Sequence, residues 1–150
     1  MIPKLHLKIV ERFREIFGHK GDIKLYFAPG KVNIIGELID YSGGNTITAA
    51  IDRGTYMVAR KRPDYKVNVY AHSFKARKSF SLDDLEKTKE DEWIIYFRGI
   101  YLNLIEKGYK ITGSDIYVYT DLPFNTSLAS SSSLCACLTY AVLDLNGIYN

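Results

Sequence analysis

The spacing of hydrophobic residues predicts three amphipathic helices along the chain. Residues 4–17 place apolar side chains at helical intervals, and Gly18 supplies a stop. Residues 92–107 carry a broad apolar face of the same period. A third helix is predicted to begin near Ser130 and to end before Gly147. Its apolar stripe needs a partner surface, either within these residues or in sequence beyond them.

Between the helices, alternation of apolar and polar residues predicts strands. We interpret residues 24–37 as two strands joined by a Pro29-Gly30 turn, and residues 45–62 as two strands around Asp52-Arg53-Gly54. Three further strands are predicted at 66–74, 78–85 and 113–123, the middle one a short edge strand or a turn. This order predicts an α+β fold, a two-layer mixed sheet backed by helices, with residues 1–150 as a single domain.

Amino-acid composition excludes only a few classes of function. The chain has 150 residues, of which 47% are hydrophobic, enough for one sizeable core. Its net charge of +3 is too small to indicate nucleic acid. We interpret the basic cluster at residues 59–66 as a solvated turn in preference to a binding patch. With neither a secretory signal nor a long apolar run, the sequence predicts a cytoplasmic protein.

The two cysteines do not suggest a metal or disulfide site. Cys135 and Cys137 are two positions apart, so on a helix they point to nearly opposite faces and cannot form a bridge with each other. No CxxC spacing is present, which makes a zinc site improbable on chemical grounds. We expect both residues to act as small buried hydrophobes.

The segment 28–44, APGKVNIIGELIDYSGG, is dense in residues with special backbone or hydrogen-bonding properties. Glycines permit tight turns, and Glu37 and Asp40 follow each other closely between them. Carboxylates accept hydrogen bonds from neighbouring hydroxyl groups, so this pair suits a sugar. On spacing alone, the two acids could equally belong to the surface of a hairpin.

The four serines Ser130 to Ser133 raise a second pair of alternatives. Serine is a preferred residue at a helix N-terminus, so the run could serve only as a cap. A helix start also offers free N–H groups and a positive dipole end, which bind phosphate. In that interpretation a serine hydroxyl reaches the Mg²⁺ that bridges the phosphates.

Both segments resemble motifs of the galactokinases, within the GHMP kinase family. Their signature A/S-P-G-R-V-N-L-I-G-E-H-T-D-Y is similar to residues 28–41, and their nucleotide loop L-P-x-G-x-G-L-S-S-S-A-S is similar to residues 122–133. Further resemblance lies in GTYMVARKR, VNVY and LIEKGYKI, so it extends over nearly the whole chain after the first helix. The resemblance implies the N-terminal domain of these kinases (the ribosomal-protein domain-2-like fold), which contains an unusual left-handed crossover.

For the sugar, the resemblance implies a site at the end of the first predicted strand pair. Glu37, Asp40, Tyr41 and Gly43 occupy substrate-binding positions of the family motif. Lys31 replaces the family's arginine, which is thought to stabilise the transferring charge; lysine keeps that charge but loses the planar fork. Leu38 replaces a histidine that contacts the sugar, which predicts altered or weakened specificity.

For the nucleotide, the resemblance implies binding of ATP with Mg²⁺. The loop positions are Asn125, Thr126, Ser127, Leu128, Ala129, Ser130 and Ser131, and the last of them occupies the metal-binding position. Both loop glycines are replaced, by Asn125 and Ser127. Serine tolerates a left-handed backbone poorly, so we expect weakened ATP binding. Trp93 matches a family tryptophan near the adenine, although a lone tryptophan on such a helix is more often part of a core.

The resemblance implies transfer of the ATP γ-phosphoryl group to the C1 hydroxyl of galactose or a related sugar. The family's catalytic aspartate, metal-binding glutamate and third motif would fall beyond Asn150, so the chain lacks the C-terminal domain and we expect it to be inactive alone. Expected partners are the sugar, ATP and a C-terminal domain or another subunit, with no nucleic acid and no membrane. The alternative is a non-catalytic sugar sensor or partner-binding relative.

Overall fold

The computed structural model describes residues 4–36, 43–86, 92–123 and 127–148. In these residues three α-helices and five strands follow one another, with two short 3₁₀ turns. The helices are α1 (Lys4–Phe17), α2 (Ile95–Glu106) and α3 (Ser130–Leu145). The strands are β1 (Lys24–Ile35), β2 (Ile47–Lys61), β3 (Lys66–Ala71), β4 (Ala76–Ser81) and β5 (Ser114–Thr120), and the turns are η1 (His72–Phe74) and η2 (Glu92–Ile94).

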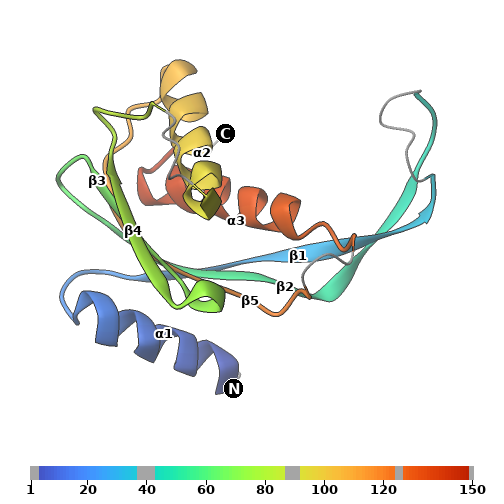
Figure 1. Ribbon diagram of the computed structural model, residues 1–150, viewed down its shortest axis with the longest axis horizontal. Helices are drawn as coiled ribbons and strands as arrows, with labels where there is room; N and C mark the ends of the chain where they lie inside the picture. Colours follow the sequence, from blue (N-terminus) through green and yellow to red (C-terminus); the bar gives the residue numbers. More distant parts are fainter. Residues whose placement is uncertain (1–3, 37–42, 87–91, 124–126, 149–150) are drawn as a thin grey trace.

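The strands form one mixed sheet in the order β1-β2-β5-β3-β4. All neighbours are antiparallel except β3 and β5, which run parallel. Helices α2 and α3 cover one face of the sheet, and α1 lies on the opposite face (Figure 1). The predicted α+β fold with a mixed sheet backed by helices is confirmed.

The predicted turn at Pro29-Gly30 is wrong, because β1 continues through it as one strand. The register between β1 and β2 shifts here, because the single residue Gly30 lies opposite residues 51–53 of β2, so the extra residues of the bulge belong to β2. Strand β1 is at the edge of the sheet, where the missing N–H of a proline costs no ladder hydrogen bond. The local Pro-Gly signal therefore marks an irregularity within a strand.

The predicted break at Asp52-Arg53-Gly54 is also wrong, because β2 runs unbroken through these residues. Gly54 pairs with Pro29, and a Cβ atom added to Gly54 would lie 2.1 Å from the carbonyl oxygen of Ala28. The glycine thus allows a close approach of two strands instead of ending one.

Each face of the sheet has its own hydrophobic core. The larger core lies under α2 and α3 and includes Phe97, Tyr101 and Leu138, all nearly inaccessible to solvent. A smaller core joins α1 to the opposite face through Phe13 and Tyr117. The apolar stripe of α3 therefore finds its partner within the chain, which answers one question that the sequence left open.

The turn predicted in the basic segment is present at residues 62–65, between β2 and β3, and residues 63–65 are exposed. Two of its arginines also belong to an ion-pair network that the sequence did not predict. Asp115, only 2% exposed, accepts hydrogen bonds from Arg60, Arg62 and Asn68. Arg60 also donates to the carbonyl oxygens of Phe17, Gly18 and Lys20 at the end of α1. Since these bonds join α1 to β2 and β5, the network fastens the helix to the sheet.

The outer ends of β1 and β2 project from the body of the molecule as a two-stranded arm (Figure 1). Its apolar side chains are poorly covered: Ile34, Ile35 and Ile47 are 63%, 61% and 55% exposed. Residues 37–42, which connect the two strands, lie outside the described residues. Among the described residues, the arm thus carries three isoleucines that are more than half exposed.

Candidate functional site

Strand β1 meets the segment before α3 at Gly30 and Lys31. The backbone N–H of Lys31 donates to the carbonyl oxygen of Leu128 at 3.2 Å. At Gly30 an added Cβ would lie 2.8 Å from that same oxygen and 2.6 Å from the side chain of Leu122. The two motifs singled out in the sequence, nearly one hundred residues apart, are thus in direct backbone contact.

Helix α3 begins without a side-chain cap. Its N-cap residue is Ala129, in the left-handed conformation with φ of 59°, and no side chain hydrogen-bonds to the helix start. The serines at the first helical positions therefore do not act as N-caps, and the alternative that the serine run serves only as a cap is wrong. Free N–H groups at a helix start suit an anion such as a phosphate group.

Ser127 occupies a glycine position of the resembling motif and keeps a glycine-like backbone. Its φ is 56°, so the left-handed conformation persists although the side chain disfavours it. The replacement of glycine by serine therefore keeps the left-handed backbone and adds a side chain to it. The cost of the replacement lies in strain and in the side chain itself.

Replacing Ser127 with glycine is expected to raise the free energy of unfolding by up to about 1 kcal/mol. Relief of the left-handed strain, about 1–2 kcal/mol, is partly offset by the greater entropy of glycine in the unfolded chain. Chemical denaturation of the two proteins measures the difference. Gly43→Ala is the matched reverse change, since Gly43 also has a positive φ, of 70°, and nothing within 4 Å of an added Cβ; it should destabilise. A loss of stability in Ser127→Gly would contradict the strain argument.

Ser133 is the member of the serine run that faces inward. It is 3% exposed, and its hydroxyl lies 2.7 Å from the carbonyl oxygen of Ala28 and 2.9 Å from the hydroxyl oxygen of Thr55. It also accepts the backbone N–H of Thr55 at 3.1 Å. The last serine of the run thus connects α3 to both β1 and β2.

A cavity of about 280 Å³ opens beside the start of α3. Ser130 and Ser131 line it together with aromatic side chains from η1 and the region of α2, notably Phe74, Trp93 and Tyr96. The rings of Phe74 and Trp93 are stacked, with centroids 5.9 Å apart and planes 11° apart. An apolar aromatic wall next to an anion-binding helix start can accept a flat ring and a phosphate together.

Trp93 therefore belongs to the wall of this cavity as well as to the core, because it also meets Phe97 edge to face. Sequence reasoning did not single out Phe74, Thr55, Tyr96 or the special role of Ser133. Phe74 is the last residue of the turn η1, which places its ring against that of Trp93. No pattern in the sequence carries that information.

The positions predicted for the sugar are described only in part. Glu37, Asp40 and Tyr41 lie outside the described residues, as do Asn125 and Thr126 of the predicted nucleotide loop. The side chain of Lys31 is exposed and donates to Asn33 Oδ1 at 3.2 Å. The sugar and nucleotide segments thus meet at Lys31 and Leu128, while the relation of the two acids to the serines stays a prediction.

Asp144, the carboxylate that follows the serine run, has a structural role. Its Oδ2 atom accepts hydrogen bonds from Lys24 Nζ and the Tyr26 hydroxyl, both at 2.7 Å. It lies fourteen residues along α3 from Ser130, which corresponds to about 21 Å along the helix. This distance excludes it as a proton acceptor for chemistry at the helix start.

The cysteines fit their predicted structural role in part. Cys137 is buried, and burial raises its thiol pKa to about 12, against a smaller opposing effect of a hydrogen bond with the Ala28 backbone. Cys135 is only partly buried. A thiol with so high a pKa is a poor nucleophile at neutral pH, so Cys137 belongs to the core.

Two features that the described residues lack bear on the site. Within the ranges 4–36, 43–86, 92–123 and 127–148, no group of three or more His, Cys, Asp or Glu side chains could hold a metal ion. None of the helices in those ranges is long and apolar enough to cross a membrane. A metal at Ser131 would thus take its remaining ligands from phosphates, water or residues outside these ranges.

Comparison of the sequence with known proteins finds similarity to galactokinases. Residues 11–61 match the family described as the galactokinase galactose-binding signature. The galactokinase of Enterococcus faecalis is 44% identical over 129 residues, which are 84% of this chain and 33% of that protein. That of Clostridium tetani is 37% identical over 143 residues, covering 95% of this chain and 36% of that protein. The chain thus spans about a third of the length of these relatives.

Solved structures that resemble this chain include a galactokinase and a mevalonate kinase. The crystal structure of Lactococcus lactis galactokinase complexed with galactose superposes with a TM-score of 0.90 at 35% identity, covering 98% of this chain and 38% of that one. The mevalonate kinase of Methanococcus jannaschii, with a TM-score of 0.72 and 18% identity over 88% of this chain and 43% of that one, shares the fold. The resemblance to the GHMP kinases is thereby confirmed, and in sequence and fold the chain fits the N-terminal part of a galactokinase.

Proposed function

We propose that this chain supplies the nucleotide-binding half-site and part of the sugar-binding half-site of a galactokinase-type phosphotransferase. The observation that carries the proposal is the backbone contact between Lys31 and Leu128, beside the uncapped start of α3. It joins a strand that leads to two carboxylates with a helix start suited to phosphate. A kinase needs such a junction, because its two substrates must meet within reacting distance.

ATP would lie with its phosphates at the N-terminus of α3 and its base in the cavity beside Phe74 and Trp93. The free N–H groups of the helix start would bind phosphate oxygens, and the Ser131 hydroxyl would face the metal. Mg²⁺, when bound, neutralises charge on the phosphates during transfer. Residues 125–131 would form the loop around the phosphates.

The sugar would bind at the end of β1. Glu37 and Asp40 would accept hydrogen bonds from its hydroxyl groups, with Tyr41 and Gly43 beside them. The Lys31 ammonium group would stabilise negative charge on the transferring phosphoryl group. Leu38 can form no hydrogen bond to the sugar, so we expect looser discrimination among related sugars than a histidine would give.

We propose that catalysis needs a further part of the protein. The described residues hold no carboxylate cluster near Ser131 that could accept the hydroxyl proton or complete a metal site. The exposed isoleucines of the β1–β2 arm suit coverage by another domain or subunit. We therefore expect the chain to bind ligands and to require its missing partner for turnover, in the cytoplasm where ATP and sugar occur together.

Titration with MgATP, followed by the fluorescence of Trp93, tests the nucleotide half-site. Trp93 is the only tryptophan and lines the cavity, so a base placed there should change its emission. Ser131→Ala is expected to weaken MgATP binding about tenfold through loss of a metal contact. Ser132→Ala, an exposed change in the same run, should leave binding unchanged. Saturable binding that is equal in all three proteins would contradict the role given to Ser131.

Calorimetry with galactose tests the other half-site. Binding that is lost in Asp40→Ala would support the sugar site, whereas absence of binding with and without MgATP would contradict it.

The alternative function is a sugar sensor without catalysis. It is favoured by Ser127, which replaces a glycine of the family's nucleotide loop, and by Ala129, which replaces a serine of that loop. Galactose binding without any response to MgATP would support that alternative.

A further inference from the structure

Ser133 connects two strands through one hydroxyl group. Ala28 and Thr55 are direct partners in the β1–β2 register. The Thr55 N–H donates to Ser133 Oγ at 3.1 Å, and Ser133 Oγ donates to the Ala28 carbonyl oxygen at 2.7 Å. The hydroxyl thus bridges the donor and the acceptor of a cross-strand pair, with a side chain that comes from a helix.

This hydroxyl lies within hydrogen-bonding distance of three polar groups. A serine hydroxyl has one proton to donate and two lone pairs to accept. Its proton faces two acceptors, the Ala28 carbonyl oxygen at 2.7 Å and Thr55 Oγ1 at 2.9 Å, and its oxygen accepts the Thr55 N–H at 3.1 Å. Because Ser133 and Thr55 are 3% and 1% exposed, water does not readily replace a lost partner.

The Ser133 contacts lie just after the proposed phosphate loop, residues 125–131. Within the loop, the carbonyl oxygen of Leu128 accepts the N–H of Lys31. Residues 128–133 are thus attached to β1 at two points, Ala28 and Lys31, on either side of Gly30. The helix start and the lysine are held in one register by these two attachments.

We propose that Ser133 is a positioning residue, which fixes the start of α3, and with it Ser130 and Ser131, relative to Lys31. The proposal rests on the proposed nucleotide site for its functional consequence. Its structural part, the attachment of residues 128–133 to Ala28 and Lys31 of β1, is independent of any ligand. Displacements on the order of 1 Å at a reacting site cost rates or affinities large factors, so loss of one attachment should be measurable.

The experiment compares four variants of the chain by amide hydrogen exchange and by MgATP titration. Ser133→Ala removes the hydroxyl, and Ser133→Cys keeps a weak donor of similar size. Ser132→Ala is the matched surface control. Tyr101→Phe is the matched stability control, because it removes a buried hydrogen bond to Ser114, 2.6 Å long, on α2 and β5.

In Ser133→Ala, exchange of the Lys31 amide is expected to accelerate about tenfold, with a similar loss of MgATP affinity and a smaller change in Ser133→Cys. Tyr101→Phe should lower the melting temperature without changing Lys31 exchange selectively, and Ser132→Ala should change neither. Unchanged Lys31 exchange in Ser133→Ala, or an equal acceleration in Tyr101→Phe, would overturn the proposal. If the parent chain shows no response to MgATP, the proposed nucleotide site fails, while the exchange data still decide the role of Ser133.

Discussion

Replacing Asp115 with alanine is expected to lower the free energy of unfolding by about 3–5 kcal/mol, the usual cost of removing one partner from a buried ion pair. The side chain of Asp115 is 3% exposed and faces Arg60 at 2.6 Å and Arg62 at 3.1 Å. Its loss would leave both guanidinium groups and the Asn68 amide without their shared acceptor. Urea denaturation of parent and variant gives the measurement.

The control for this change is Asp64→Ala, which removes the exposed partner of Arg62. Asp64 accepts two hydrogen bonds from that guanidinium group, at 2.8 and 2.6 Å, which lower its pKa to about 2, yet its side chain is 48% exposed. An exposed ion pair contributes little to stability, so we expect a small effect. Equal losses in the two variants would contradict the importance given to burial.

Acid conditions should distinguish the parent from Asp115→Ala further. Burial alone would raise the pKa of Asp115, but hydrogen bonds from Asn68, Arg60 and Arg62 outweigh it and hold the pKa below its usual value. A lowered pKa in the folded state contributes stability above the unfolded pKa, near 3.9, and that stability is lost as the pH falls through the folded pKa. The stability difference between parent and variant should therefore shrink below about pH 4.

Replacing Gly30 with alanine is expected to destabilise the fold by about 1–3 kcal/mol and to weaken MgATP binding on the order of a hundredfold. The new methyl group would lie 2.8 Å from the Leu128 carbonyl oxygen and 2.6 Å from a methyl group of Leu122. The leucine side chain can move, but the carbonyl is backbone, so the segment before α3 must shift away from Lys31. Denaturation and Trp93 fluorescence report the two effects separately.

Gly99→Ala provides the matched control. Gly99 lies within α2, and nothing lies within 4 Å of an added Cβ atom. Alanine should therefore stabilise the protein by up to about 1 kcal/mol through helix propensity and leave MgATP binding unchanged. Unaltered nucleotide affinity in Gly30→Ala would show that the contact between β1 and the loop has no influence on the site.

Local patterns predicted the helices, the strand-rich middle of the chain and the α+β class, because amphipathic periodicity reflects burial on one face. The errors lie where a residue acts through distant partners. The Pro29-Gly30 pair has the composition of a turn, yet it lies within an edge strand, opposite a bulge in β2. Gly54 has the appearance of a break, yet it permits the close approach of two strands. Neither pairing is encoded within a few residues.

The candidate site also contains residues that the sequence predicted and residues that only the fold reveals. Motif resemblance identified Lys31 and residues 127–131, which the fold brings together at Leu128. It did not distinguish Ser133 from its identical neighbours, because only helical phase and packing turn that one hydroxyl inward. Nor could it identify Arg60 and Arg62 as partners of Asp115, more than fifty residues further along the chain.

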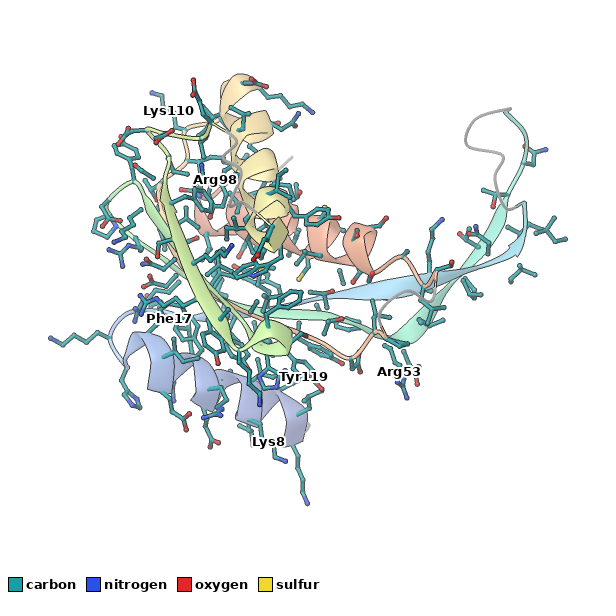
Figure 2. All side chains as sticks on the ribbon, viewed as in Figure 1. Lys8, Phe17, Arg53, Arg98, Lys110 and Tyr119 are labelled. Carbon is teal, nitrogen blue, oxygen red and sulfur yellow. The ribbon has the colours of Figure 1, made fainter. Side chains whose placement is uncertain are left out.

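The projecting arm of β1 and β2 has a thermodynamic consequence. Its exposed isoleucines lie in the sequence on either side of residues 37–42, which carry the two acids proposed to hold the sugar. Figure 2 shows side chains crowded in the body of the molecule and sparse along the arm. A domain that packs on the isoleucines would restrict the ends of the connection and reduce the entropy that sugar binding must overcome. By thermodynamic linkage, bound sugar would then raise the affinity of that domain for the arm by the same factor, so domain assembly and sugar binding would favour each other.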